Sequence, residues 1–529
     1  MKKLILGGLV AMAAGIGGVT VVQAQTAETP VRGGTAIAVL PQEPTSLNPA
    51  LSTNVSDRVL GCIMYEGLLM LSPDYKLMPL LAKSWSVSPD GLTYSFELQK
   101  TTWHDGKPFT SEDVAYSLID VSAKYSSVFA PAGRVIDKIE TPAPDKVVIK
   151  LSRPFGPFLI SLGCIQGAAI MPAHIFKGTD PVKTAANISQ LAGTGSFKYS
   201  SWQHGDHVKL VRNPTYYMEG KPYLDEVIGK VISQASARVQ ALQAGEVDVS
   251  RAFPPNYLST VRAAPNLKVE TSDSAPLTTL VFYNTKKKPF DNKLVRKALF
   301  MAIDRDYIFK NAFFEVGQVG TAPFTTEIAW AANPDIDYRK MYPFDVAKAN
   351  AMLDEAGLKR GPDGKRFSTT ISIFSNQYPE FQQVAAAMRS MWQAVGVEAS
   401  TEALEDATMI KKVFTDMDFD TTVQTYTSYS DPALGVARTW STAVIGKSYG
   451  NPSAYSNPLV DELFAKGEGA TDFAERGPFY KQAQAIVAED LPVFTLRQYK
   501  ENDAASKRLR GVWGKAQGSG YWTEAWLAK

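Results

Sequence analysis

The sequence contains few of the residues and motifs on which enzymes rely. Only two cysteines and four histidines occur in 529 residues. Neither a G-x-S-x-G nucleophile elbow nor an H-E-x-x-H zinc motif is present. The GKS segment at 446–448 lacks the glycine that begins a phosphate-binding loop, and the GTG segment at 193–195 lacks the third glycine of a dinucleotide fingerprint. We therefore predict no catalytic residue and no cofactor.

Candidate metal ligands are equally scarce. His204 and His207 lie three residues apart, a spacing that zinc ligands can have. Neither a cysteine nor a cluster of carboxylates completes a set of ligands around them, and a surface turn between two strands explains both residues more simply. We predict no metal site.

An excess of either charge is also missing. The chain has 55 Lys and Arg against 53 Asp and Glu, and without Lys2 and Lys3 the basic count falls by two to 53. A nucleic-acid partner requires a strongly basic face. The balance therefore argues against nucleic-acid binding.

Only one apolar run approaches the length of a membrane span. It covers residues 4–22, follows Lys2 and Lys3, and contains five glycines. Val22 and Ala24 place small residues at the −3 and −1 positions of a signal-peptidase site. We predict that residues 1–24 form a signal peptide, cut after Ala24, which directs the chain to the periplasm. A membrane anchor is the alternative.

The two cysteines, Cys62 and Cys164, allow two interpretations. In an oxidising compartment they can form one disulfide. Both can equally be small buried hydrophobic residues. The sequence leaves this choice open.

One short stretch looks like an acid/base site. Residues 103–114, WHDGKPFTSEDV, contain His104, Asp105, Glu112 and Asp113. The first half has the form of a tight turn. Thr110 and Asp113 have the spacing of a helix capping box, and the helix dipole favours acidic residues in the first turn. We predict that this cluster is structural.

Strand and helix patterns alternate along the chain, which indicates an α/β fold. Residues 92–98 alternate apolar and polar side chains after a Pro-Asp-Gly turn. Helices are expected at 236–244, closed by Gly245, after Asn292, and from Asp345 to Gly357.

Aromatic residues are abundant, with 22 Tyr, 25 Phe and 9 Trp. Several of them fall in expected loops, among them Tyr426, Tyr429 and Trp440. A cleft with many aromatic and few titratable groups suits binding better than catalysis. Most of the aromatic residues are nevertheless expected in the core.

Five segments, in the same order, resemble the family 5 extracellular solute-binding proteins, which are the peptide- and nickel-type receptors of ABC importers. The resemblance spans about residues 35–500. The segments are LAKSWSVSPDGLTYSFELQKTTWHDGKPFTSEDV, GTGSFKYSSWQHGDHVKLVRNPTYY, ARVQALQAGEVDV, NTKKKPFDNKLVRKALFMAIDR and PFDVAKANAMLDEAGL.

The resemblance implies a type II periplasmic binding protein fold of the large kind, with two α/β lobes, an extra subdomain and a cleft between the lobes. The lobes would be joined near 281–285 and 493–498. The implied division is 1–24 signal peptide, 25–75 lobe one, 76–189 subdomain of lobe one, 190–284 lobe one, 285–494 lobe two and 495–529 lobe one.

The resemblance also indicates where a ligand would bind. In peptide-binding members an Asp three residues before a D-P or E-P dipeptide holds the peptide ammonium. Here the dipeptide begins at Asp431, for which a loop-shaping role is implied, and Ser428 stands three residues before it. The ligand is therefore expected to be neutral or anionic near Ser428. Arg438 is either an anion partner or half of a structural ion pair. The candidate ligand-binding residues are Asn48, Tyr426, Ser428, Tyr429, Arg438 and Trp440.

We predict a monomeric periplasmic receptor, and not an enzyme, that captures a peptide or peptide-like small solute and delivers it to an ABC permease at the inner membrane. A receptor for a sugar, an opine or an aromatic acid on the same scaffold is the main alternative. A secreted hydrolase and a sensory or chaperone-like module are further ones.

Overall fold

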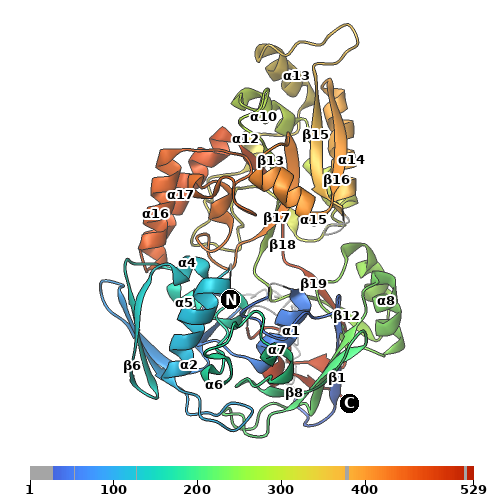
Figure 1. Ribbon diagram of the computed structural model, residues 1–529. Helices are drawn as coiled ribbons and strands as arrows, with labels where there is room; N and C mark the ends of the chain where they lie inside the picture. Colours follow the sequence, from blue (N-terminus) through green and yellow to red (C-terminus); the bar gives the residue numbers. More distant parts are fainter. Residues whose placement is uncertain (1–27, 53, 127, 376–379, 517–520) are drawn as a thin grey trace, which may run out of the picture.

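Two lobes, stacked one above the other, make up the protein in the computed structural model (Figure 1). The structure describes residues 28–52, 54–126, 128–375, 380–516 and 521–529. The predicted signal peptide and its cleavage site lie outside these residues. No helix in the described ranges is long and apolar enough to cross a membrane.

Lobe one, the lower part of Figure 1, is built on a seven-stranded mixed sheet. Its central strand β1 (Thr35–Leu40) pairs in parallel with two strands that come much later in the chain. The order across the sheet is β12 (Leu267–Thr271), β19 (Asn502–Ser506), β11 (Val249–Ser250), β1, β10 (Glu226–Val231), β9 (His207–Arg212) and β8 (Phe197–Gln203).

Helices cover this sheet and bury its apolar side chains. The main ones are α1 (Val55–Met64), α6 (Ala173–Phe176), α7 (Ala186–Ser189), α8 (Ala235–Ala244) and α9 (Leu258–Ala263). As predicted, α8 ends at Gly245, which adopts φ +75°. A left-handed residue at this position is commonly glycine because a Cβ is unfavourable there.

The subdomain has a four-stranded antiparallel sheet at the side of lobe one (Figure 1). The order is β4 (Ala82–Val87), β5 (Thr93–Leu98), β7 (Lys146–Leu151) and β6 (Ile136–Ala143). The predicted strand is β5, whose Tyr94, Phe96 and Leu98 are buried. The short segments beside the sheet are the hairpin β2 (Leu69–Leu71) and β3 (Leu77–Pro79), and the helices α2 (Ser111–Tyr116), α3 (Ala123–Tyr125), α4 (Ala130–Gly133) and α5 (Phe158–Ser161).

The residues 103–114 have the structural role that the sequence predicts. Asp113 accepts a hydrogen bond from the Thr110 backbone N–H at 2.9 Å, and the capping box of α2 is complete. His104 accepts from the Gly193 N–H through Nδ1, and its Nε2 lies 2.9 Å from the Gly195 carbonyl oxygen. The Asp105 Oδ2 lies 2.7 Å from the His174 Nε2, so His104, Asp105 and Asp113 each have a structural partner. Burial lowers the pKa of His104 to about 4.

Lobe two has a six-stranded mixed sheet. The order is β14 (Gln318–Val319), β18 (Val493–Tyr499), β13 (Leu277–Tyr283), β17 (Thr421–Thr427), β15 (Phe367–Phe374) and β16 (Val397–Leu404). Its helices are α10 (Lys293–Met301), α11 (Arg305–Asn311), α12 (Tyr338–Met341), α13 (Val346–Glu355), α14 (Glu380–Ala394), α15 (Asp406–Met409), α16 (Pro458–Gly469) and α17 (Phe473–Asp490). The predicted caps are present, since Asn292 and Asp345 accept hydrogen bonds from the first turns of α10 and α13.

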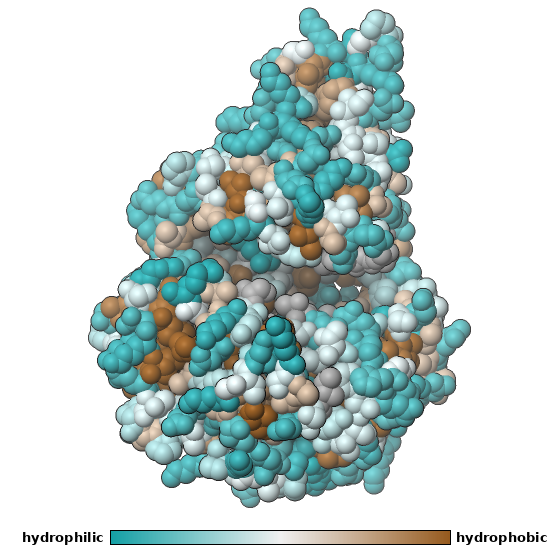
Figure 2. Space-filling model, viewed as in Figure 1, coloured by the Kyte–Doolittle hydropathy of each residue, from teal (hydrophilic) through white to brown (hydrophobic). Residues whose placement is uncertain are grey.

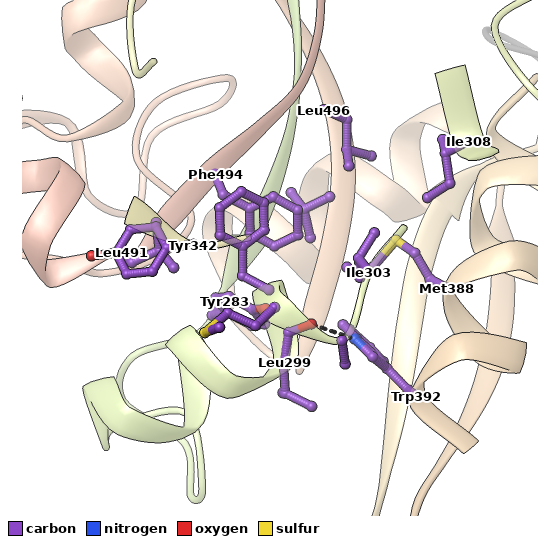
Figure 3. Close-up of a cluster of buried hydrophobic side chains, with 14 of the residues drawn as sticks. Tyr283, Leu299, Ile303, Ile308, Tyr342, Met388, Trp392, Leu491, Phe494 and Leu496 are labelled. Atoms are coloured by element: carbon purple, nitrogen blue, oxygen red, sulfur yellow. Dashed lines mark hydrogen bonds between the residues drawn. The ribbon is translucent and has the colours of Figure 1, made fainter. Parts of the chain in front are cut away.

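Aromatic residues fill the core between this sheet and its helices (Figure 3). The rings of Phe300 and Phe494 lie 4.3 Å apart, centroid to centroid. The Trp392 indole N–H donates to the Leu299 carbonyl oxygen at 3.1 Å. This packing makes lobe two a stable body of its own that can carry one wall of a cleft.

The chain crosses between the lobes at points that differ from the predicted ends of lobe one at 284 and lobe two at 494. All of β13 and β18 pair within the lobe-two sheet, so the crossings fall between Thr271 and Leu277 and between Tyr499 and Asn502. Both strands are almost wholly buried and run without a break to the edge of their lobe. For this reason the sequence pattern carries no sign of the boundary.

Cys62 and Cys164 form a disulfide. It joins α1 of lobe one to the short helical turn that follows α5 of the subdomain. The link spans 102 residues of sequence. The disulfide alternative left open by the sequence is therefore the one in the structure.

Candidate ligand site between the lobes

A cavity of about 370 Å³ lies where the chain crosses between the lobes. Figure 2 shows the hollowed waist between the two halves of the molecule. We call this space the hinge cavity. It is lined by Pro41, Arg251, Ala252, Phe253, Pro254, Pro255 and Asn256 of lobe one, by Phe314, Val316, Glu380 and Gln383 of lobe two, and by Arg497, Tyr499, Glu501 and Asn502 of the second crossing.

Arg497 is the central cation of the hinge cavity. Its side chain has no exposed surface, and its guanidinium lies 4.1 Å from the Phe313 ring centroid and 3.7 Å from that of Tyr499. Only Nη2 has an ionic partner, the Glu380 Oε1 at 3.1 Å. Nε and Nη1 are buried and have no hydrogen-bond partner among the described residues. The two rings fix the guanidinium plane through cation–π contacts.

Two acids line the hinge cavity together with this cation. Glu380 begins α14 on lobe two, whereas Glu501 lies on the crossing itself. Burial, reinforced by the nearby carboxylate of Asp503, raises the pKa of Glu501 to about 7. The Arg251 guanidinium forms an ion pair with the Asp503 carboxylate at 3.4 Å. It also donates a hydrogen bond to the Ser272 hydroxyl at 3.1 Å.

A second cavity, of about 440 Å³, lies between the subdomain and the lobe-two loop that follows β17. We call it the loop cavity. Tyr429 and Arg438 line it, opposite Pro131 and Arg134 of the subdomain. Tyr429 also packs against the apolar core of the subdomain. The loop predicted to contact ligand therefore lies at a junction between the lobes.

Arg438 has no ion-pair partner in the part of the chain that the structure describes. Its guanidinium lies 5.1 Å from the Tyr426 ring centroid, and its buried Nε has no hydrogen-bond acceptor there. The structural ion pair expected from the sequence belongs instead to Asp431, which contacts Arg476. The Arg438 guanidinium is therefore available to pair with an anionic group of a ligand.

Ser428 lies beneath the surface of the loop. It is 2% exposed, and its hydroxyl oxygen accepts from the Ser430 N–H at 3.3 Å. The neighbouring residues Tyr429 and Ser430 have φ angles of +45° and +69°. Such conformations cost energy for residues other than glycine and concentrate at functional sites. The strain fits a loop that is shaped to present Tyr429.

The other candidates lie in the interior. Tyr426 and Trp440 are buried in the core of lobe two, where the Tyr426 hydroxyl donates to the Gly450 carbonyl oxygen at 2.9 Å. Asn48 is buried in lobe one, and its amide donates to the Asn187 side-chain oxygen at 2.9 Å. The structure thus brings Tyr429 and Arg438 to a cavity and leaves these three residues in packing positions.

The cavities hold no set of metal ligands. Among the described residues no group of three or more His, Cys, Asp and Glu side chains could hold an ion. His204 and His207 contact Glu43 and Asp206 at distances of 3.3 and 2.9 Å, respectively.

Comparison with known proteins supplies the identity of this two-lobed architecture. Residues 76–447 match the model of the bacterial extracellular solute-binding proteins, family 5. The chain belongs to this family. The oligopeptide-binding protein AppA of Bacillus subtilis is 28% identical over 496 residues, covering 91% of this chain and 89% of AppA. The glutathione-binding protein GsiB of Escherichia coli K12 is 28% identical over 492 residues, covering 89% and 90%.

Solved structures agree on the fold of the family 5 proteins. AppA of B. subtilis in complex with a nonapeptide superposes with a TM-score of 0.78 at 27% identity, over 95% of this chain and 100% of that one. AgaA of Agrobacterium tumefaciens R10 in complex with agropinic acid gives 0.75 at 26% identity, over 94% and 99%.

Sequence reasoning missed the residues of the hinge cavity. Arg497 stands in β18, whose seven residues are otherwise uncharged and all buried. A charged residue inside such a strand is the signal that could have identified Arg497, because charged side chains are rarely fully buried unless they are paired. Glu380 and Glu501 carry no comparable signal.

Proposed function

We propose that the chain is the periplasmic receptor of an ABC importer, which captures a peptide-like solute between its lobes and delivers it to the membrane permease. The observation that carries the proposal is the pair of cavities lined from both lobes, one at the hinge and one at the lobe-two loop. A ligand bound there touches both lobes and so favours the closed form over the open form.

Contacts at the far edge of the cleft support a closing motion. Gly156 of the subdomain donates to the Glu468 carbonyl oxygen at 2.7 Å, and the Arg153 guanidinium lies 2.7 Å from the Glu468 carboxylate. The ion pair is partly exposed, so it breaks at modest cost. Tyr429, Leu434 and Phe473 of lobe two also pack against the apolar core of the subdomain, so separating the lobes around the two crossings exposes these apolar contacts as well.

The loop cavity favours an anionic group on the ligand. Ser428 supplies no charge where the resemblance places an Asp in peptide-binding members, and Arg438 lines the loop cavity without an ion-pair partner among the described residues. A charge-assisted hydrogen bond is worth about 1.5–3 kcal/mol, against about 1 kcal/mol for a neutral one. A carboxylate facing Arg438 is the best fit.

The same observation favours a second candidate, a non-peptide acid. One structural neighbour, AgaA, is described with agropinic acid, and another, AppA, with a nonapeptide. A carboxylate-bearing solute of either kind satisfies Arg438. The receptor acts as a monomer after removal of residues 1–24, and its ligand leaves it chemically unchanged.

Native mass spectrometry of freshly purified protein tests the proposal. A co-purifying small molecule should be found at one per chain, with unaltered mass after release and rebinding. Solution scattering should show a smaller radius of gyration when it is added back. A ligand recovered as a reaction product, or an unchanged radius of gyration on binding, would contradict a transport receptor.

A further inference from the structure

The wall of the hinge cavity carries two bases and two acids, and one of these acids has no ion-pair partner among the described residues. Arg251 is matched by Asp503 and Arg497 by Glu380, at 3.4 and 3.1 Å. Glu501 is the remaining charged group on the cavity wall. It has neither a salt bridge nor a side-chain hydrogen bond to any described residue. The Glu501 carboxylate is therefore left without a direct partner when it is ionised, although the charges of Arg251 and Arg497 lie near enough to act on it.

A half-buried carboxylate without a partner is unfavourable, because burial removes part of its hydration without replacing it. Burial raises the pKa of Glu501 to about 7, because the charged form of the carboxyl group is disfavoured there relative to the neutral form. A cationic group entering the cavity supplies the missing partner.

Arg497 adds a second requirement at the same wall. Its Nε and Nη1 are buried donors without acceptors, and its plane is fixed between Phe313 and Tyr499. An oxygen atom of a ligand could accept hydrogen bonds from these two N–H groups. The cavity is therefore complementary to a ligand with a cationic group at Glu501 and a carbonyl or carboxylate oxygen at Arg497. An α-amino acid unit carries both groups within a few bonds of each other.

We infer that the hinge cavity is the subsite for the α-ammonium end of an amino-acid-derived ligand, with Glu501 as the counter-charge and Arg497 as the donor to the adjacent oxygen. This inference rests on the proposed function and adds where the ligand's amine is held. It relocates the amine from the lobe-two loop, where Ser428 offers no charge, to the crossing between the lobes.

An equimolar tripeptide library and the same library after N-acetylation provide the probe. The unmodified protein should retain the free peptides at least tenfold over the acetylated ones in native mass spectrometry. Glu501→Gln should abolish this preference, because the amide keeps the shape and removes the charge. Glu219→Gln, which changes an exposed acid of lobe one that lines neither cavity, should leave the preference intact.

Each outcome separates the two proposals. Peptide capture without a preference for the free amine, or with a preference that survives Glu501→Gln, overturns this inference and leaves the transport receptor standing. Capture of neither library overturns the peptide ligand and this inference with it, while a co-purified non-peptide ligand still supports the receptor. Thermal unfolding without ligand checks the fold: Glu501→Gln should melt no lower than the unmodified protein, since it removes an unpaired buried charge.

Discussion

Arg476 of α17 holds Asp431 of the lobe-two loop through two parallel hydrogen bonds. Nη1 lies 2.6 Å from Oδ2 and Nη2 lies 2.7 Å from Oδ1, and neither side chain has exposed surface. Nε donates to the Gly467 carbonyl oxygen at 2.6 Å. The Asp431-Pro432 dipeptide of the lobe-two loop is thus anchored to the helices behind it, which is the loop-shaping role that the sequence indicates for Asp431.

Asp431→Asn should lower the free energy of unfolding by about 3–5 kcal/mol, because it leaves the Arg476 charge buried and unpaired. Urea denaturation without ligand measures the change. Glu462→Gln is the matched control, since Glu462 forms an exposed pair with Lys466 and should contribute less than about 1 kcal/mol. Equal effects of the two substitutions would contradict the buried pair.

The disulfide should contribute substantially to stability, because it closes a loop spanning 102 residues of sequence. Replacing both Cys62 and Cys164 by Ala should cost about 2–5 kcal/mol in the free energy of unfolding. A reducing agent should shift the unmodified protein towards the variant and leave the variant unaffected. Identical unfolding midpoints of the oxidised protein and the variant would refute a bond in the mature chain.

His104 should make stability depend on pH below neutrality. Burial lowers its pKa from 6.5 to about 4, so the unfolded chain binds one more proton than the folded chain between these values. The contribution of neutral His104 is therefore fully present above pH 6.5 and is lost as the pH falls towards 4, by about 3 kcal/mol in total.

His104→Gln tests this pH dependence, because the amide does not titrate. The free energy of unfolding of the unmodified protein should fall more steeply between pH 7 and about 4.5 than that of the variant. His204→Gln, which changes an exposed histidine, should keep the slope of the unmodified protein. Parallel slopes for all three proteins would show that His104 is not the responsible group.

Arg438→Gln should weaken binding of the co-purified ligand by about 10- to 100-fold, which corresponds to the loss of one charge-assisted hydrogen bond. Calorimetry with the ligand identified by mass spectrometry measures the change. Stability without ligand should stay close to that of the unmodified protein, since the guanidinium has no ion-pair partner within the described ranges. Arg389→Gln on α14, which lines neither cavity, is the control. Unchanged affinity would assign Arg438 to packing against Tyr426.

Local features of the fold could be predicted because few residues determine them. The capping box of Thr110 and Asp113, the Gly245 stop and the strand 93–98 each depend on residues that are close in sequence. The crossing points could not be predicted, because strands β13 and β18 continue unbroken to the lobe edge.

The candidate site, like the fold, could be predicted from the sequence only in part. The lobe-two loop could be located from its Asp-Pro dipeptide, and Tyr429 and Arg438 do line a cavity. Burial of Ser428, Tyr426 and Trp440 depends on how the loop folds back on its own helices, which no local pattern specifies. Glu380 and Glu501 meet only because two distant segments pass each other at the hinge.

The position of β19 in the sheet determines when lobe one can complete its fold during synthesis. This strand lies between β11 and β12, with which it forms antiparallel ladders, yet it begins at Asn502. Until the ribosome has added those residues, the lobe-one sheet has two unpaired edges where β19 will fit, and the lobe-two sheet has the same gap between β14 and β13 until β18 is made. The two half-made sheets are therefore the parts of the nascent chain that are open to chaperones and aggregation. Both sheets are closed only by strands near the end of the sequence, so neither lobe can complete its fold before almost the whole chain has been made.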